Sequence, residues 1–163
     1  MTFSSKAEYG VRLMVELGRQ DGDQPTSLKA IAEAEDLPLS YLEHVVASLK
    51  RARLVASSRG AHGGYRLARP AEEIAMDEVV LALEGSIAPM DCFTDVPPGR
   101  VACSHEGDRG ASCSTRLLWM RVHSGIVQAL QGTTLAELVE FSRCADPLPE
   151  PPAATALPVV QAG

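Results

Sequence analysis

The sequence predicts a mostly α-helical protein that carries one small β-hairpin. Apolar residues recur at helical spacing in six segments, and a glycine-rich stretch separates two short runs with strand character. The 163 residues are too few for two large domains, and the apolar share of 45% suits one buried core. Because only 4% of the residues are aromatic, this core must be aliphatic.

Two amphipathic helices are expected at the start of the chain. Residues 4–20 carry apolar side chains every three or four positions, and the Asp-Gly-Asp-Gln-Pro stretch that follows ends this helix. The second helix covers residues 28–35, with Thr26 or Ser27 as its N-cap. It is expected to bury Leu28, Ile31 and Ala32.

A third helix follows a tight turn at Pro38, because proline restricts the residue before it. Ser40 and Glu43 form a capping-box pattern, which places the start of this helix at Ser40. Its buried face is predicted to hold Leu42, Val45, Val46 and Leu49. The opposite face then presents Ser40, His44, Ala47, Ser48 and Arg51. A helix, a tight turn and a second helix in this order indicate a helix-turn-helix.

A β-hairpin is predicted directly after this helix pair. Residues 55–58 and 65–67 form its strands, and the glycine-rich residues 59–64 reverse the chain between them. The hairpin carries Arg59, His62 and Arg66 at its tip and flank, where a contact to phosphate or to the minor groove of DNA needs them. The whole first half therefore reads as a winged helix-turn-helix.

The second half contains three further helical segments. Residues 77–84 end at Gly85 as a C-cap, and Thr133 or Thr134 caps a short final helix. The long helix over residues 114–131 is apolar on more faces than a lone surface helix buries, so it needs a partner, most simply its copy in a homodimer. The expected divisions are a DNA-binding domain (1–85), a cysteine loop (86–113), a dimerisation helix with the short helix (114–142) and a disordered tail (143–163).

The charge is distributed unevenly along the chain, although the net charge is −6. Residues 1–70 hold ten Lys and Arg against eight acids, and the stretch 44–71 contains six basic residues and no acid. Such a stretch is either a solvated basic face or a surface for DNA phosphates. Together with the wing it favours double-stranded DNA, with Tyr41 equally suited to packing. The candidate DNA-binding residues are Ser40, Tyr41, His44, Arg51, Arg59, Gly60, His62 and Arg66.

Cysteines provide the second functional signal. No secretory signal or run of ~18 apolar residues is present, so a cytoplasmic protein with reduced thiols and no membrane contact is expected. Cys92, Cys103 and Cys113 fall in a loop rich in Gly, Pro, Asp and Ser and lack the CxxC pairing of zinc ribbons. Three such thiolates suit an iron–sulfur cluster or zinc, with His105 or Glu8 as candidates for a missing ligand. Three unrelated cysteines are the alternative.

The residues 41–55 (YLEHVVASLKRARLV) and 58–70 (SRGAHGGYRLARP) closely resemble the winged-helix repressors of the IscR and NsrR type, the Rrf family. The segments 7–10, 117–119 and 134–138 resemble the same proteins, so the resemblance covers residues 1 to about 142. It implies a homodimeric transcription regulator with a near-palindromic operator. It also implies that Cys92, Cys103 and Cys113 hold a [2Fe–2S] or [4Fe–4S] cluster, whose loss, oxidation or nitrosylation changes DNA affinity.

Two departures from the family pattern concern the cluster. IscR-like members have a histidine three residues after the last cysteine, where this chain has Arg116, which stays protonated and does not ligate iron. NsrR-like members take a carboxylate from the first helix of the other subunit, and Glu8 stands at the matching place; its alternative is a solvated carboxylate paired with Arg12. The cysteine spacings are longer than usual, which leaves the nuclearity open, and Cys144 has no counterpart.

The function predicted from these features is operator binding controlled by a cluster that senses redox state, nitric oxide or iron–sulfur supply. One alternative is a winged-helix regulator with structural zinc or thiol-switch cysteines, and another is an iron–sulfur electron carrier. An enzyme is not expected, because the sequence offers no nucleophile–base pair, paired carboxylates or phosphate-binding glycine loop.

Overall fold

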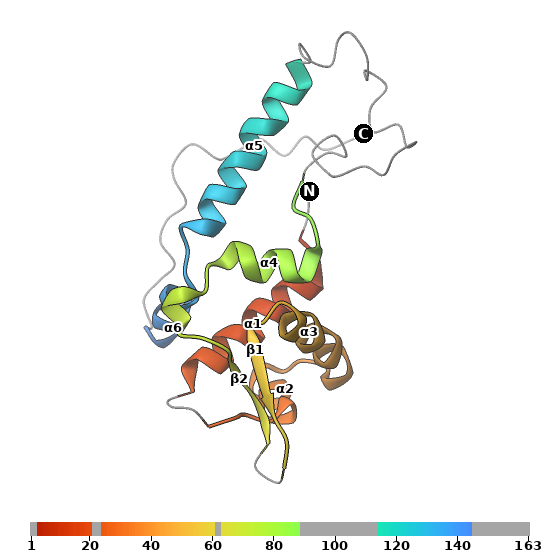
Figure 1. The fold of residues 1–163 in the computed structure, drawn as a ribbon, viewed down its shortest axis with the longest axis vertical. Coiled ribbons are helices and arrows are strands. Elements are labelled where there is room, and N and C mark those ends of the chain that lie inside the picture. The colour runs from red at the N-terminus through yellow and green to blue at the C-terminus, as the bar shows by residue number, and fades with distance from the viewer. Residues whose placement is uncertain (1–2, 21–23, 61–62, 89–113, 145–163) are drawn as a thin grey trace.

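The computed structural model describes residues 3–20, 24–60, 63–88 and 114–144. The described elements, in chain order, are α1 (Ser5–Arg19), α2 (Leu28–Glu35), α3 (Leu39–Arg51), β1 (Val55–Ser58), β2 (Gly64–Leu67), the 3-10 turn η1 (Ala71–Glu73), α4 (Met76–Glu84), α5 (Ser114–Gln131) and α6 (Leu135–Arg143) (Figure 1). The mostly helical fold with one hairpin is confirmed. Because α6 includes Arg143, this residue is helical and does not belong to the predicted tail, whose residues 145–163 lie outside the described ranges.

The predicted start of the third helix is wrong by one residue. Helix α3 begins at Leu39 with Pro38 as its N-cap, and no side chain caps it. The carbonyl oxygen of Pro38 accepts hydrogen bonds from the amides of Tyr41 and Leu42, both at 3.1 Å. Ser40 therefore lies inside the first turn, where its hydroxyl is not in the N-cap position, and the capping box does not form.

The other helix starts agree with the predicted alternatives. Ser27 rather than Thr26 caps α2, since its hydroxyl accepts a hydrogen bond from the amide of Ala30 at 3.1 Å. Thr134 rather than Thr133 caps α6 through the amide of Glu137. Gly85 follows α4 with a φ of +81°, a conformation that glycine adopts without steric cost.

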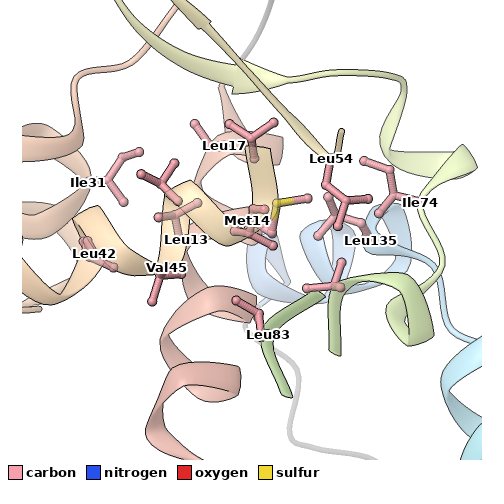
Figure 2. Close-up of a cluster of buried hydrophobic side chains, with 14 of the residues drawn as sticks. Leu13, Met14, Leu17, Ile31, Leu42, Val45, Leu54, Ile74, Leu83 and Leu135 are labelled. Atoms are coloured by element: carbon pink, nitrogen blue, oxygen red, sulfur yellow. The ribbon is translucent and has the colours of Figure 1, made fainter. Parts of the chain in front are cut away.

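Helix α1 lies at the centre of the core and packs against α2, α3, α4 and α6. Figure 2 shows the aliphatic side chains that meet around it, and Leu13 and Met14 of α1 are completely buried. The predicted inner face of α3 is buried as expected, whereas Leu28 of α2 is only half-buried. All buried side chains among the described residues are apolar, so burial of aliphatic surface is the main stabilising contribution.

The wing is the antiparallel hairpin β1–β2, with Val55 opposite Leu67 and Ser58 opposite Gly64. A third segment joins it, because Thr26 and Tyr65 exchange two backbone hydrogen bonds of 2.8 Å on the outer side of β2. The segment before α2 is thereby fixed to the wing, and the wing is held against the helix-turn-helix.

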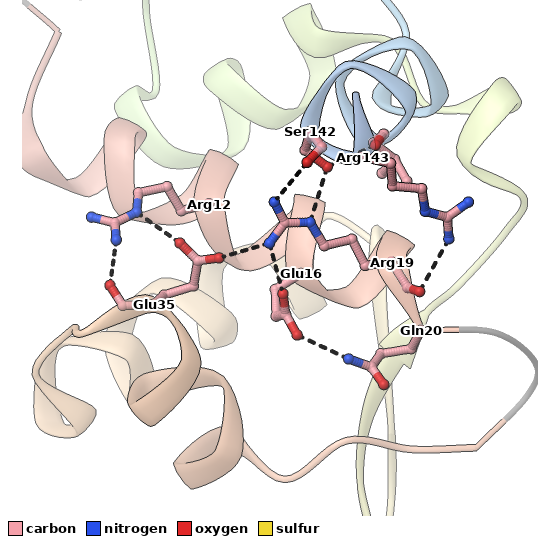
Figure 3. A network of polar contacts seen from close by, with 8 residues as sticks. Arg12, Glu16, Arg19, Gln20, Glu35, Ser142 and Arg143 are labelled. Atoms are coloured by element: carbon pink, nitrogen blue, oxygen red, sulfur yellow. Dashed lines mark hydrogen bonds and ion pairs between the residues drawn. The ribbon is translucent and has the colours of Figure 1, made fainter. Parts of the chain in front are cut away.

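A polar network fastens three helices together next to the core (Figure 3). The carboxylate of Glu35 on α2 contacts Nε of Arg12 at 2.9 Å and Nη1 of Arg19 at 3.4 Å, both on α1. Nε of Arg19 in turn donates to the hydroxyl of Ser142 on α6 at 2.9 Å. The first helix of the helix-turn-helix is thus connected through α1 to the last described helix.

Helix α5 stands away from the rest of the described fold (Figure 1). None of its residues is buried, and α4 is the main element it contacts. Its C-terminal end returns to the body, where Leu135 and Ile74 share a backbone hydrogen bond of 2.9 Å. The large apolar side chains of α5 that are exposed are Leu117, Leu118, Met120 and Val122.

Candidate nucleic-acid interface

The outer face of α3 is polar and open to solvent. Ser40, His44 and Arg51 are exposed along it, as predicted, and Ala47 between them is exposed as well. Its last turn is basic, with Lys50 and Arg51. An α-helix with a free polar face of this length has the dimensions that fit the major groove of B-DNA.

Tyr41 faces the protein more than the solvent. It is half-buried, and its ring meets the ring of Tyr9 on α1 edge-on, with centroids 5.3 Å apart and planes at 79°. Edge-to-face pairs of this kind are favourable. The structure therefore gives Tyr41 a packing role between α1 and α3, beside the contact to DNA that the sequence left open.

The hairpin places a cation at the end of β1. Arg59 is exposed directly after this strand, and Gly60 follows with a φ of +117°, which side-chain-bearing residues rarely adopt. The amide of Gly63 donates to the carbonyl oxygen of Gly60 at 3.0 Å and closes the turn. Arg66 is exposed on β2, whereas His62 lies outside the described residues.

A side-chain hydrogen bond connects α3 with the wing. Nζ of Lys50, in the last turn of α3, donates to the hydroxyl of Ser57 on β1 at 2.6 Å. This contact fixes the two DNA-facing elements relative to each other. Sequence reasoning counted Lys50 among the basic residues but did not single it out, because no local periodicity predicts a contact between a helix and the following strand.

The candidate cofactor residues are only partly described. Cys92, Cys103, Cys113 and His105 lie outside the described residues. Glu8 lies on α1 with its side chain 64% exposed, and its carboxylate is 4.0 Å from Nη1 of Arg12. Within the described ranges no three His, Cys, Asp or Glu side chains gather in a metal-binding arrangement.

Two further residues bear on the cofactor. Arg116 is exposed at the start of α5, and Cys144 is exposed just after α6 as a free thiol. The donors available for a cluster are therefore the three loop cysteines and the solvent-accessible carboxylate of Glu8. In chemical type this set fits an iron–sulfur cluster, for which thiolates are the preferred ligands.

A helix-turn-helix with an exposed recognition face, braced by a hairpin with an arginine at its turn, defines a winged-helix DNA-binding transcriptional regulator. The family model that matches residues 3–141 is Rrf2, described as an iron-dependent transcriptional regulator. The chain belongs to this family.

Individual relatives agree with this assignment. The regulator CymR of Bacillus subtilis is 35% identical over 87% of this chain and 92% of its own length. IscR of Sodalis glossinidius is 36% identical over 90% of this chain and 83% of its own length. The solved structure of B. subtilis CymR, called the global cysteine regulator, superimposes with a TM-score of 0.69 over 86% of this chain and 98% of that one.

A structure of T. potens IscR superimposes with a TM-score of 0.66 at 34% identity, over 87% of this chain and 88% of that chain. These relatives are transcriptional regulators and not enzymes, and the same holds for this protein. None of the described helices is long and apolar enough to cross a membrane.

Proposed function

We propose that this protein acts in the cytoplasm as a homodimeric transcriptional regulator, most simply a repressor, whose affinity for a near-palindromic operator is set by an iron–sulfur cluster. The observation that carries the DNA-binding part is the joined surface of α3 and the wing, where Lys50 holds Ser57 and both elements present basic side chains. In this arrangement α3 enters the major groove, with Ser40 and His44 facing base edges. Arg51, Arg59 and Arg66 meet phosphate or the adjacent minor groove.

The unpartnered helix α5 supports the dimer. Four large apolar side chains on this helix are between 38% and 57% exposed, which is costly for a helix that remains in water. A second copy of α5 packed against the first buries such side chains in an isologous interface. Two recognition helices related by a two-fold axis then read half-sites one helical turn apart, which is why the operator is near-palindromic.

The cluster is assigned to Cys92, Cys103 and Cys113, with Glu8 of the other subunit as the fourth ligand. When bound, an iron–sulfur cluster supplies a centre that reacts with oxidants and nitric oxide. The thiolates hold it, and Glu8 connects it to α1, which packs directly against α3. The iron-dependent description of the family and the likeness to IscR support this assignment.

A second candidate is regulation without a cluster, because the matching CymR structure is that of a global cysteine regulator. In that case the three cysteines bind zinc or act as thiol switches while the winged helix binds DNA in the same way. A cluster that only carries electrons is the third candidate, and it makes no use of the wing.

Anaerobic purification distinguishes these candidates. We expect a brown protein with visible absorbance, with iron and acid-labile sulfide in equal amounts, and with different operator affinity before and after removal of the cluster. Zinc without sulfide, or metal-free protein with full operator response to thiol oxidation, would support the second candidate. A cluster whose removal leaves operator binding unchanged would rule out cluster control.

A further inference from the structure

A cavity of about 470 Å³ lies at the base of the wing, away from the outer face of α3. It is lined by the C-terminal end of α1, the segment before α2, strand β2 and the chain that leads into η1. Its volume falls within the range of roughly 300–1,000 Å³ that is usual for small-molecule sites. The lining residues used below are Gln24, Leu67, Arg69 and Glu72.

The first feature of the cavity is an open strand edge. Tyr65 directs its backbone groups to Thr26, and Ala68 donates to the carbonyl oxygen of Leu54 on the β1 side at 3.0 Å. Because backbone groups alternate along an antiparallel strand, the amide of Leu67 points to the Thr26 side, away from β1. No backbone group among the described residues pairs with it there.

The second feature is a buried donor without an acceptor. Nε of Arg69 is the one fully covered side-chain nitrogen or oxygen, among the described residues, that lacks a hydrogen-bond partner. The same guanidinium is held by Glu78 through Nη2, so its head is fixed while Nε stays unpaired. A buried N–H group without an acceptor is unfavourable, and an acceptor placed in the cavity relieves this cost.

We propose that this cavity binds a small metabolite through a carboxylate, which accepts hydrogen bonds from the Leu67 amide and from Nε of Arg69. A carboxylate is favoured over a phosphate dianion because the acid Glu72 lines the same cavity. Such a ligand touches α1, β2 and the approach to η1 together, and so it fixes the base of the wing. Its effect on the operator rests on the proposed function, whereas its binding does not.

The test is a titration of the full-length protein with sodium acetate, followed by nitrogen–proton correlation spectra. Sodium chloride at equal ionic strength and inorganic phosphate are run in parallel. We expect saturable shifts of the Leu67 amide and the Arg69 Nε signal with acetate, at roughly millimolar concentration because so small an ion has few atoms to contribute binding energy. Shifts that never saturate, or that sodium chloride reproduces, would overturn the proposal, as would saturation by phosphate alone.

Two variants and one control make the site assignment specific. Arg69→Lys keeps the positive charge but lacks the Nε–H group, and Gln24→Ala changes an exposed lining residue without touching the core. We expect at least a fivefold weaker acetate response in Arg69→Lys, a smaller change in Gln24→Ala, and none in Arg59→Lys, which lies outside the cavity lining. An unchanged response in Arg69→Lys would place the ion elsewhere. Operator affinity measured with and without acetate then tests the effector role separately.

Discussion

Gly64 on β2 lies so close to Thr26 that a Cβ on this glycine would stand 2.4 Å from the Thr26 carbonyl oxygen. The next residue, Tyr65, exchanges its two backbone hydrogen bonds with Thr26. The second glycine of the wing is therefore required by the close approach of two backbones and not by the turn itself. It allows the segment before α2 to join the hairpin as a third strand.

Gly64→Ala is expected to destabilise the protein by about 1–3 kcal/mol, because the new Cβ must separate β2 from the backbone at Thr26. Urea unfolding measures this change. Ser58→Ala, at an exposed position opposite Gly64 in the hairpin, serves as the control and should stay within about 0.5 kcal/mol of the parent. Equal stability of the two variants would contradict the close approach of β2 and Thr26.

Glu35→Gln is expected to cost about 1–2 kcal/mol of unfolding free energy, since it removes the charge that two arginines of α1 share. The Glu35 side chain is only 14% exposed, so water replaces the lost contact poorly. Glu33→Gln is the matched control, because Glu33 is 69% exposed in a surface pair with Lys29, which contributes little. A Glu35→Gln protein as stable as Glu33→Gln would show that the network of Figure 3 contributes nothing to stability.

Arg59→Ala tests the wing as a DNA contact. Operator affinity should fall by roughly 1–3 kcal/mol if Arg59 reaches a base edge, or the salt dependence should lose about one unit of slope if it meets only phosphate. Arg116→Ala removes the same charge from α5, at the opposite end of the described fold from the wing (Figure 1), and should change neither quantity. Unaltered binding by Arg59→Ala at every salt concentration would exclude the wing tip from the interface.

Single serine substitutions of the cysteines test the ligand assignment. Cys92→Ser, Cys103→Ser and Cys113→Ser should each lose visible absorbance after anaerobic purification, because each removes a thiolate that iron prefers. Cys144→Ser should remain coloured, and helicity by circular dichroism should be similar in all four. A colourless Cys144→Ser beside a brown Cys103→Ser would reverse the assignment.

Glu8→Ala tests whether the carboxylate on α1 connects the cluster to DNA binding. We expect it to retain some cluster, with an altered absorption or EPR spectrum, and to reduce the ratio of holo to apo operator affinity. The shift is limited to about 1–3 kcal/mol, because one ligand bond biases an equilibrium only by its differential energy. Glu33→Ala, another exposed acid, should behave as the parent. An unchanged spectrum and ratio would leave Glu8 as a surface carboxylate paired with Arg12, and His105 would become the next ligand to test.

The helices and the hairpin could be predicted closely from the sequence, because their signals are local. The buried face of α3 follows from apolar residues at helical spacing, and the strand bounds follow from the glycine-rich turn between them. The start of α3 was predicted one residue late, because the capping motif at Ser40 competes with a Pro38 carbonyl that already opens the helix. Two equally good local patterns overlapped there.

The sequence by itself determined the winged helix-turn-helix, the polar outer face of α3 and the apolar excess of α5, since periodicity and turn chemistry depend only on neighbours along the chain. Only the tertiary structure decided that Lys50 meets Ser57, that Tyr41 packs on Tyr9 and that Glu35 joins α2 to α1. It also decided that Arg69 leaves a buried donor beside an open strand edge. Such contacts join residues from different elements, and their partners are set by how whole helices and strands pack around α1.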